Sequence, residues 1–102
     1  MDYKMLMIIM DENLRDDVEV VLERHGIEGF SEIPTVLGEG RSGKKLDSRL
    51  HPGANSIVFS IVPASVAQTV KEDLLHSCLG SKDDENCKMQ LHIGIINVED
   101  FV

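Results

Sequence analysis

The chain has few cysteines, few basic residues and only short apolar stretches. Of its 102 residues, two are cysteine and ten are lysine or arginine, against 18 aspartates and glutamates, and the net charge is −8. Two cysteines do not make a disulfide framework. The acidic balance argues against nonspecific nucleic-acid binding and against a basic membrane patch. The length predicts one domain, residues 1–102, with one modest core.

Long apolar runs are also missing. The longest strongly apolar stretch is Met5 to Met10, which is too short to span a membrane. It also lacks the charged lead and the small-residue cleavage site of a signal peptide. We therefore expect no membrane insertion and a cytoplasmic location.

Apolar periodicity predicts six elements in the order β-α-β-β-α-β, the ferredoxin-like arrangement. Asn13 is the expected cap of the first helix and Gly26 its stop, and Pro34 indicates an edge strand or a bulge. The fold class is therefore α+β, a four-stranded antiparallel sheet with two helices on one face. The expected strands are 3–10, 30–37, 55–62 and 88–98, and the expected helices are 13–25 and 64–78.

Two helices can cover only one face of such a sheet. The first strand is apolar on both faces, with Met5, Met7 and Ile9 on one and Leu6, Ile8 and Met10 on the other. We expect this second face, together with the mixed second faces of the last two strands, to lie uncovered. It is either a large binding surface or, as we favour, a contact between subunits.

A glycine-rich basic segment, residues 38–45, interrupts this acidic chain. Four of the ten cations fall within nine residues, namely Arg41, Lys44, Lys45 and Arg49. Glycines let backbone N–H groups approach a ligand, and neighbouring cations attract anions. The segment is a candidate anion site at the start of a long loop without periodicity, residues 38–54. The alternative is a solvated, flexible loop.

Several segments resemble the PII nitrogen-regulatory family. Residues 16–30 are similar to its first helix and turn, which begin Asp-Asp-Val and end Gly-Ile-x-Gly. Residues 36–43, Val-Leu-Gly-Glu-Gly-Arg-Ser-Gly, are similar to its V-x-G-x-G-R-x-x-G signature. Val62-Pro63 precedes the second helix as in that family, and Lys88 stands where the family has a lysine. The chain thus resembles a divergent PII-like signalling protein.

The resemblance implies a non-catalytic regulator, a ferredoxin-like homotrimer that binds ATP, ADP or AMP in clefts between its subunits. Its long loop after the second strand, the T-loop, would be residues 38–54 and would contact a partner transporter or enzyme. The residues implied at the ligand are Gly38, Gly40 and Arg41 at the base of that loop, with Arg41 suited to bidentate phosphate pairing, and Lys88. Ile27 to Phe30 would lie near the adenine side of the cleft.

The chain departs from the family pattern at three places. The family's glycine-rich B-loop is here residues 81–88, which keep only Lys88 and contain three consecutive acids that would repel a triphosphate. The arginines that follow the family's last strand are absent from residues 97–102. Tyr3 is the sole tyrosine, so the loop cannot be uridylylated on a tyrosine.

Two other functional classes stay open. A metal-binding or metal-tolerance trimer of similar fold would use the two cysteines, Cys78 and Cys87, and three of the four histidines, His51, His76 and His92. The two cysteines could form a redox pair if their Cα atoms lie within about 7 Å. A small enzyme on a ferredoxin-like scaffold is disfavoured, because no Ser–His–Asp or Cys–His arrangement and no paired catalytic carboxylates stand out. We therefore expect no enzyme activity.

Overall fold

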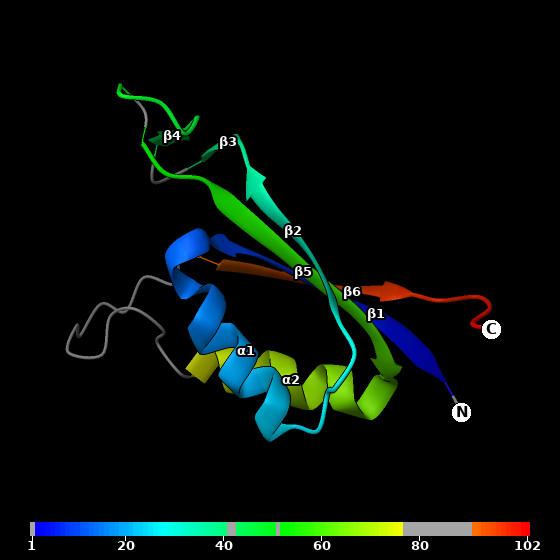
Figure 1. The fold of residues 1–102 in the computed structure, drawn as a ribbon. Helices are drawn as coiled ribbons and strands as arrows, with labels where there is room; N and C mark the ends of the chain where they lie inside the picture. The colour runs from blue at the N-terminus through cyan, green and yellow to red at the C-terminus, as the bar shows by residue number, and fades with distance from the viewer. Residues whose placement is uncertain (1, 41–42, 51, 77–90) are drawn as a thin grey trace.

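The computed structural model describes residues 2–40, 43–50, 52–76 and 91–102. In this part of the chain a four-stranded antiparallel sheet, in the order β2-β5-β1-β6, carries two helices on one face (Figure 1). The expected ferredoxin-like arrangement is confirmed. Its elements are β1 (Tyr3–Asp11), η1 (Glu12–Leu14), α1 (Arg15–Arg24), β2 (Ser31–Val36), β3 (Gly38–Gly40), β4 (Gly43–Lys45), β5 (Asn55–Pro63), α2 (Ala64–His76) and β6 (Leu91–Asn97).

The core lies between the sheet and the helices. β1 pairs with β5 along its whole length, from Tyr3 opposite Pro63 to Asp11 opposite Asn55, and with β6 on its other side. Every second residue of β1 therefore points at the helices. The fully or nearly buried side chains of this core include Leu6, Ile8, Met10, Val18, Leu22, Val58, Val70 and Leu74. Burying each such side chain stabilises the fold by roughly 1.5–3 kcal/mol.

The first helix begins differently from the prediction. The expected cap, Asn13, lies inside the short 3₁₀ turn η1, and Asp11 caps η1 by accepting a hydrogen bond from the Asn13 backbone N–H. The helix α1 itself follows Leu14, whose side chain makes no capping hydrogen bond. Asp11 is the last residue of β1 and keeps extended backbone angles, which a capping residue needs. The expected stop at Gly26 fits its φ of +76°, since a positive φ favours glycine.

The uncovered face of β5 is more apolar than we expected. The mixed side of this strand, with Ser56, Val58, Ser60 and Val62, is the buried side that faces the helices. Ser56 Oγ donates to Glu32 Oε2 over 2.7 Å and Ser60 Oγ donates to the Gly29 carbonyl, so both hydroxyls are satisfied where they are buried. The open face instead presents Ile57, Phe59 and Ile61, opposite Ile9, Met7 and Met5 of β1.

The segment expected to be an irregular loop contains a short hairpin, β3–β4, in which Gly38 pairs with Lys45. The hairpin projects from the end of the main sheet, beyond the helices (Figure 1). The expectation for Pro34 is confirmed, because β2 is an edge strand whose pairing with β5 shifts register between Ile33 and Val36. Among the described residues, neither helix is long and apolar enough to cross a membrane.

Candidate ligand pocket at the free edge of β5

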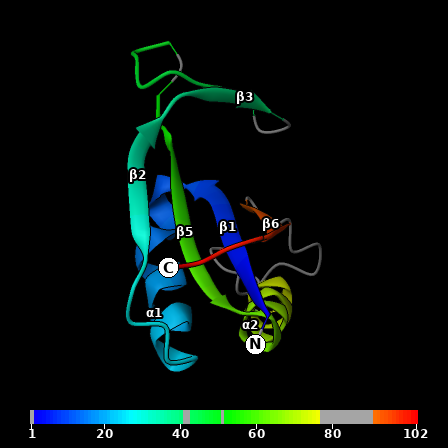
Figure 2. The same ribbon diagram turned by 90° about the vertical axis from the view of Figure 1, so that its right-hand side faces the viewer.

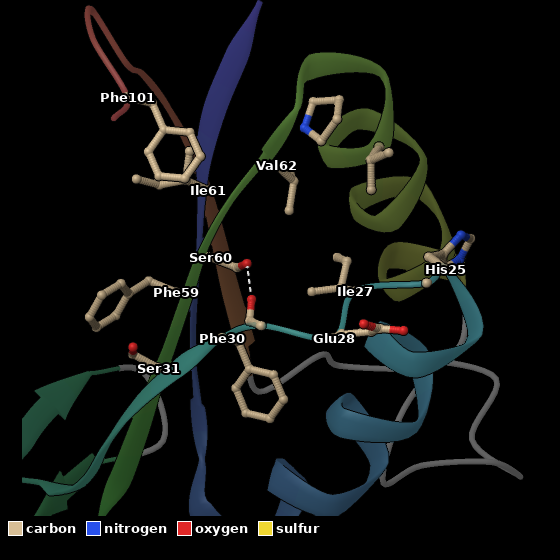
Figure 3. Close-up of a pocket in the computed structure, with 14 residues that line it drawn as sticks. His25, Ile27, Glu28, Phe30, Ser31, Phe59, Ser60, Ile61, Val62 and Phe101 are labelled. Atoms are coloured by element: carbon tan, nitrogen blue, oxygen red, sulfur yellow. Dashed lines mark hydrogen bonds between the residues drawn. The ribbon is translucent and has the colours of Figure 1, made fainter.

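An open pocket of about 760 Å³ lies along the edge of β5 (Figure 3). The pairing of β2 with β5 ends where Ser31 meets Phe59. Among the described residues, no strand pairs with residues 60–63 of β5 on this side, because the chain at 26–30 turns away toward α1. The pocket is lined by His25, Gly26, Ile27, Glu28, Gly29, Phe30, Ser31, Phe59, Ser60, Ile61, Val62, Pro63, Val66 and Phe101.

The wall formed by residues 26–30 is held by hydrogen bonds within the chain. The Ile27 backbone N–H donates to the Leu22 carbonyl over 3.0 Å, and the Ile27 side chain is 6% exposed. The hydrogen bond from Ser60 Oγ to the Gly29 carbonyl ties the middle of this wall to β5 (Figure 3). A concave, mainly apolar surface with a few fixed polar groups is typical of a small-molecule site.

The chemistry of this pocket suits a flat, apolar ring with a polar edge. Ile27, Phe30 and Val62 offer apolar contact, while the edge of β5 carries backbone N–H and C=O groups beyond the end of its ladder with β2. Each backbone residue other than proline supplies one donor and one acceptor. Such an edge can pair with the donors and acceptors of a heteroaromatic base.

Side-chain contacts between the two helices lie at the rim of the pocket. His25 Nε2 lies 2.6 Å from Asp73 Oδ2, and Arg24 Nη1 lies 3.2 Å from the same oxygen. Asp73 belongs to α2, so these contacts join the end of α1 to the neighbouring helix. They position His25 at the pocket and fix the start of the 26–30 wall.

The predicted anion-binding residues divide between described and undescribed parts of the chain. Gly38 and Gly40 lie in β3, whereas Arg41 and Lys88 lie outside the described residues. Neither Gly38 nor Gly40 has a positive φ, and a Cβ atom would meet only ordinary contact at Gly38 and open space at Gly40. Within the described chain, backbone angle and crowding leave room for a side chain at both. Their assignment to a ligand stays a prediction.

Lys45, one of the four clustered cations, makes strong contacts within the chain. Its Nζ lies 2.7 Å from Asp11 Oδ2 and 3.2 Å from Asn55 Oδ1, and the Lys45 and Asp11 side chains are only 14% and 16% exposed. Burial by itself would raise the pKa of Asp11, but the hydrogen bonds from Lys45 and the Asn13 N–H outweigh it and lower that pKa. Sequence reasoning missed this pair, because it depends on how β4 meets the end of β1.

A second network joins α1 to β2. Arg15 Nε donates to Glu32 Oε1 over 3.0 Å, and Ser56 Oγ donates to the other Glu32 oxygen. The hydrogen bond from Ser56, followed by that from Arg15, lowers the pKa of Glu32 although partial burial opposes the shift. Glu32 is therefore a structural anion that positions the strand leading from the pocket wall to the hairpin.

The pocket is lined by the residues at one end of the paired strands β2 and β5, from Ser31 and Phe59 onward. The strand β3 follows the other end of β2 (Figure 1). The six residues of β2 separate them. At about 3.3 Å per residue, such a strand spans roughly 20 Å. A ligand the size of a nucleotide cannot fill the pocket and reach the glycine-rich hairpin of the same chain.

The described part of the chain contains no candidate metal site. There, no group of three or more His, Cys, Asp or Glu side chains lies close enough to hold an ion. His76 Nδ1 contacts the Glu72 carbonyl of its own helix, 2.6 Å away, and His92 is exposed on β6. His51, Cys78 and Cys87, and hence the hypothesis of a cysteine pair, lie outside the described residues.

Comparison with known proteins places the fold among PII-like proteins. No protein-family model matches the chain, and no curated protein matches its sequence. Among solved structures, it is similar to CPII, a nitrogen regulatory PII-like protein from Thiomonas intermedia bound to ADP, AMP and bicarbonate. That match has 18% identity over 96% of both chains and a TM-score of 0.67.

Two further solved structures show the same likeness. A PII-like signalling protein from Thermus thermophilus is 19% identical, with 96% of this chain and 91% of that chain covered and a TM-score of 0.66. A DUF3240 family protein from Shewanella baltica is 16% identical, with 100% and 96% covered and a TM-score of 0.67. The fold implied by the sequence motifs is therefore confirmed.

Proposed function

We propose that this chain is a non-catalytic, PII-like regulatory protein that binds an adenine nucleotide in clefts between the subunits of a homotrimer. The observation that supports this best is the pocket at the free edge of β5. Its wall, residues 26–30, includes Ile27 to Phe30, which the family resemblance puts beside the adenine ring. A similar protein, CPII, has been crystallised with ADP and AMP.

The cleft would be completed by a second copy of the chain. One chain holds the pocket and the glycine-rich hairpin about 20 Å apart, so one nucleotide can use both only if they come from different subunits. The uncovered sheet face supplies the surface for assembly, because it is apolar over both central strands. That face comprises Met5, Met7, Ile9, Ile57, Phe59 and Ile61.

The nucleotide would carry fewer phosphates than ATP. Residues 83–85 are all acidic, and residues 97–102 contain no cation, so two places that contact phosphates in the family lack the needed charge. Arg41 and Lys88 remain as phosphate partners. AMP and ADP carry less negative charge than a triphosphate, so fewer cations are needed to bind them.

Binding would act as a switch on the 38–54 loop. Phosphate contacts to the backbone of Gly38 and Gly40 and to Arg41 would stabilise one state of this loop. A ligand shifts such an equilibrium only as far as its affinities for the two states differ. The stabilised loop would then engage a partner transporter or enzyme in the cytoplasm.

Mixing two defective variants tests the shared cleft. Gly29→Trp places a bulky ring on the pocket wall, where a Cβ atom would meet nothing within 4 Å, and Arg41→Ala removes the proposed phosphate partner. We expect calorimetry to detect AMP or ADP binding by the unaltered chain and loss of binding by each variant alone. Mixed trimers refolded together should regain binding at the interfaces that combine an intact pocket with an intact hairpin.

Two results would count against the proposal. No heat with ATP, ADP, AMP or cyclic AMP for the folded, unaltered chain would remove the nucleotide. A dimer or a monomer in sedimentation equilibrium would remove the trimeric cleft. As a matched control, Leu50→Ala alters an 87% exposed side chain of the same loop and should leave the affinity unchanged.

A further inference from the structure

The C-terminal residues cross the open face of the sheet and reach the pocket. β6 ends at Asn97, whose side chain accepts a hydrogen bond from Lys4 Nζ at the end of β1. From there the chain runs over β1 toward β5, in front of the sheet (Figure 2). Neighbouring strands lie about 4.8 Å apart, so residues 98–101 bridge roughly 10 Å and bring Phe101 to the free edge of β5.

Phe101 is an aromatic side chain at the mouth of the pocket. Its ring meets that of Tyr3 edge-on, with the centroids 5.3 Å apart and the planes at 61°. It lines the pocket beside Ile61 (Figure 3), yet 51% of its surface remains exposed. Tyr3 thus supports one part of the ring while the rest stays available for contact.

The negative charge of residues 97–102 restricts the kind of ligand that Phe101 can contact. Residues 97–102 carry two acids, Glu99 and Asp100, and no cation. A polyphosphate beside this segment would be repelled, whereas an uncharged ring would not. Aromatic side chains stack on the faces of nucleic bases, and such stacking tolerates any base.

We propose that Phe101 is a ligand-binding residue of the pocket, which stacks on the heteroaromatic ring of a nucleoside or nucleoside monophosphate and covers it. This inference rests on the proposed function, and it adds the C-terminal segment, residues 97–102, to the proposed nucleotide site. The ligand's phosphate then points away from Glu99 and Asp100. The C-terminal segment therefore recognises the ligand by contact with its ring and not by charge.

A single tryptophan reports on this contact, because the chain contains none. In Phe101→Trp, we expect AMP and adenosine to change the tryptophan fluorescence saturably, and ribose 5-phosphate, which has no base, to leave it unchanged. Val102→Trp is the matched control, since Val102 is fully exposed and does not line the pocket. Its fluorescence should not respond to any of the three compounds.

Truncation of the ring tests the energy of the contact. Calorimetry of Phe101→Ala should show AMP binding about tenfold weaker than in the unaltered chain, and Phe101→Trp should retain the affinity. Circular dichroism and sedimentation should show the same fold and assembly for all variants. Unchanged AMP affinity in Phe101→Ala, with normal binding by the unaltered chain, would overturn this inference alone. Absence of AMP and adenosine binding by the unaltered chain would overturn it together with the proposed nucleotide site.

Discussion

Replacing Asp11 with asparagine removes one charge from the ion pair that fixes the root of the β3–β4 hairpin. Asp11 Oδ2 lies 2.7 Å from Lys45 Nζ, and its other oxygen accepts from the Asn13 N–H. Asparagine is also a good capping residue, so Asp11→Asn keeps an acceptor for η1 while it leaves Lys45 without a counter-charge. The substitution therefore separates the ion pair from the cap.

The expected cost lies between those of surface and buried ion pairs. Exposed pairs contribute about 0.2–1 kcal/mol, and breaking a fully buried pair costs about 3–5 kcal/mol. With exposures of 14% and 16%, this pair is close to the buried limit but keeps some solvent. We expect Asp11→Asn to lower the free energy of unfolding by about 2 kcal/mol at pH 7. Asp11→Ala, which also loses the cap, should cost about 1 kcal/mol more.

The assay is urea unfolding followed by circular dichroism at one fixed protein concentration, because assembly would shift the midpoint. Lys45→Met supplies the second arm of a double-mutant cycle, and the coupling energy should be about 1–2 kcal/mol. Glu39 and Lys44 form the control pair in the same hairpin, 3.9 Å apart with side chains 66% and 49% exposed. The coupling energy of this control pair should be at most about a few tenths of a kcal/mol.

The pH dependence has a definite sign. The pKa of Asp11 is lowered in the folded chain, so its carboxylate contributes stability above its ordinary pKa of 3.8 and loses it as the pH falls through the lower, folded value. The difference between the unaltered chain and Asp11→Asn should be constant from neutral pH to just above 3.8 and shrink below it. A coupling energy no larger than that of the control pair, or a difference that does not depend on pH, would refute the reasoning.

Three further substitutions test other parts of the structure. Glu32→Gln should lower the free energy of unfolding in urea by about 1–2 kcal/mol at pH 7. Because the hydrogen bond from Ser56 lowers the pKa of Glu32, this difference should shrink as the pH falls below 4.5. Thr35→Asn should raise the unfolding free energy by up to about 1 kcal/mol in thermal melts, since a β-branched residue at a φ of +57° is strained and asparagine tolerates it. Met7→Lys on the open face should dissociate the proposed trimer in sedimentation, whereas Val20→Lys, at a 55% exposed position of α1, should not.

Much of the fold could be predicted from local pattern. The short apolar runs of β1 and β5, the positive-φ glycine after α1 and the proline of β2 each act through neighbours in sequence. Those predictions agree with the structure to within a few residues. Which side of β5 is buried could not be predicted in the same way. It depends on two serines finding partners, Glu32 and Gly29, that belong to another part of the chain.

The candidate site was less accessible to sequence reasoning. The family resemblance pointed to Ile27–Phe30, but the pocket exists because the ladder between β2 and β5 stops at Phe59, which is a property of the folded sheet. In the sequence Lys45 is one of four clustered cations, and nothing local indicates that Asp11 lies against it. In the sequence, Phe101 belongs to a C-terminal segment, residues 97–102, whose only noted feature is that it lacks arginines. Its position depends on the path of residues 98–101 across the sheet.

The open face and the pocket impose one geometric requirement on each other. Phe101 and Ile61 line the pocket from the same side of the sheet that carries Met5, Met7 and Phe59. Any second copy that covers this face must therefore stop at, or pass over, the C-terminal segment that crosses it (Figure 2). If the trimer forms, its contact ends beside the pocket, and the glycine-rich hairpin of the neighbouring subunit can meet the ligand there. Assembly and ligand binding would then share the Phe101 segment, so a ligand that stacks on Phe101 should also stabilise the trimer against dilution.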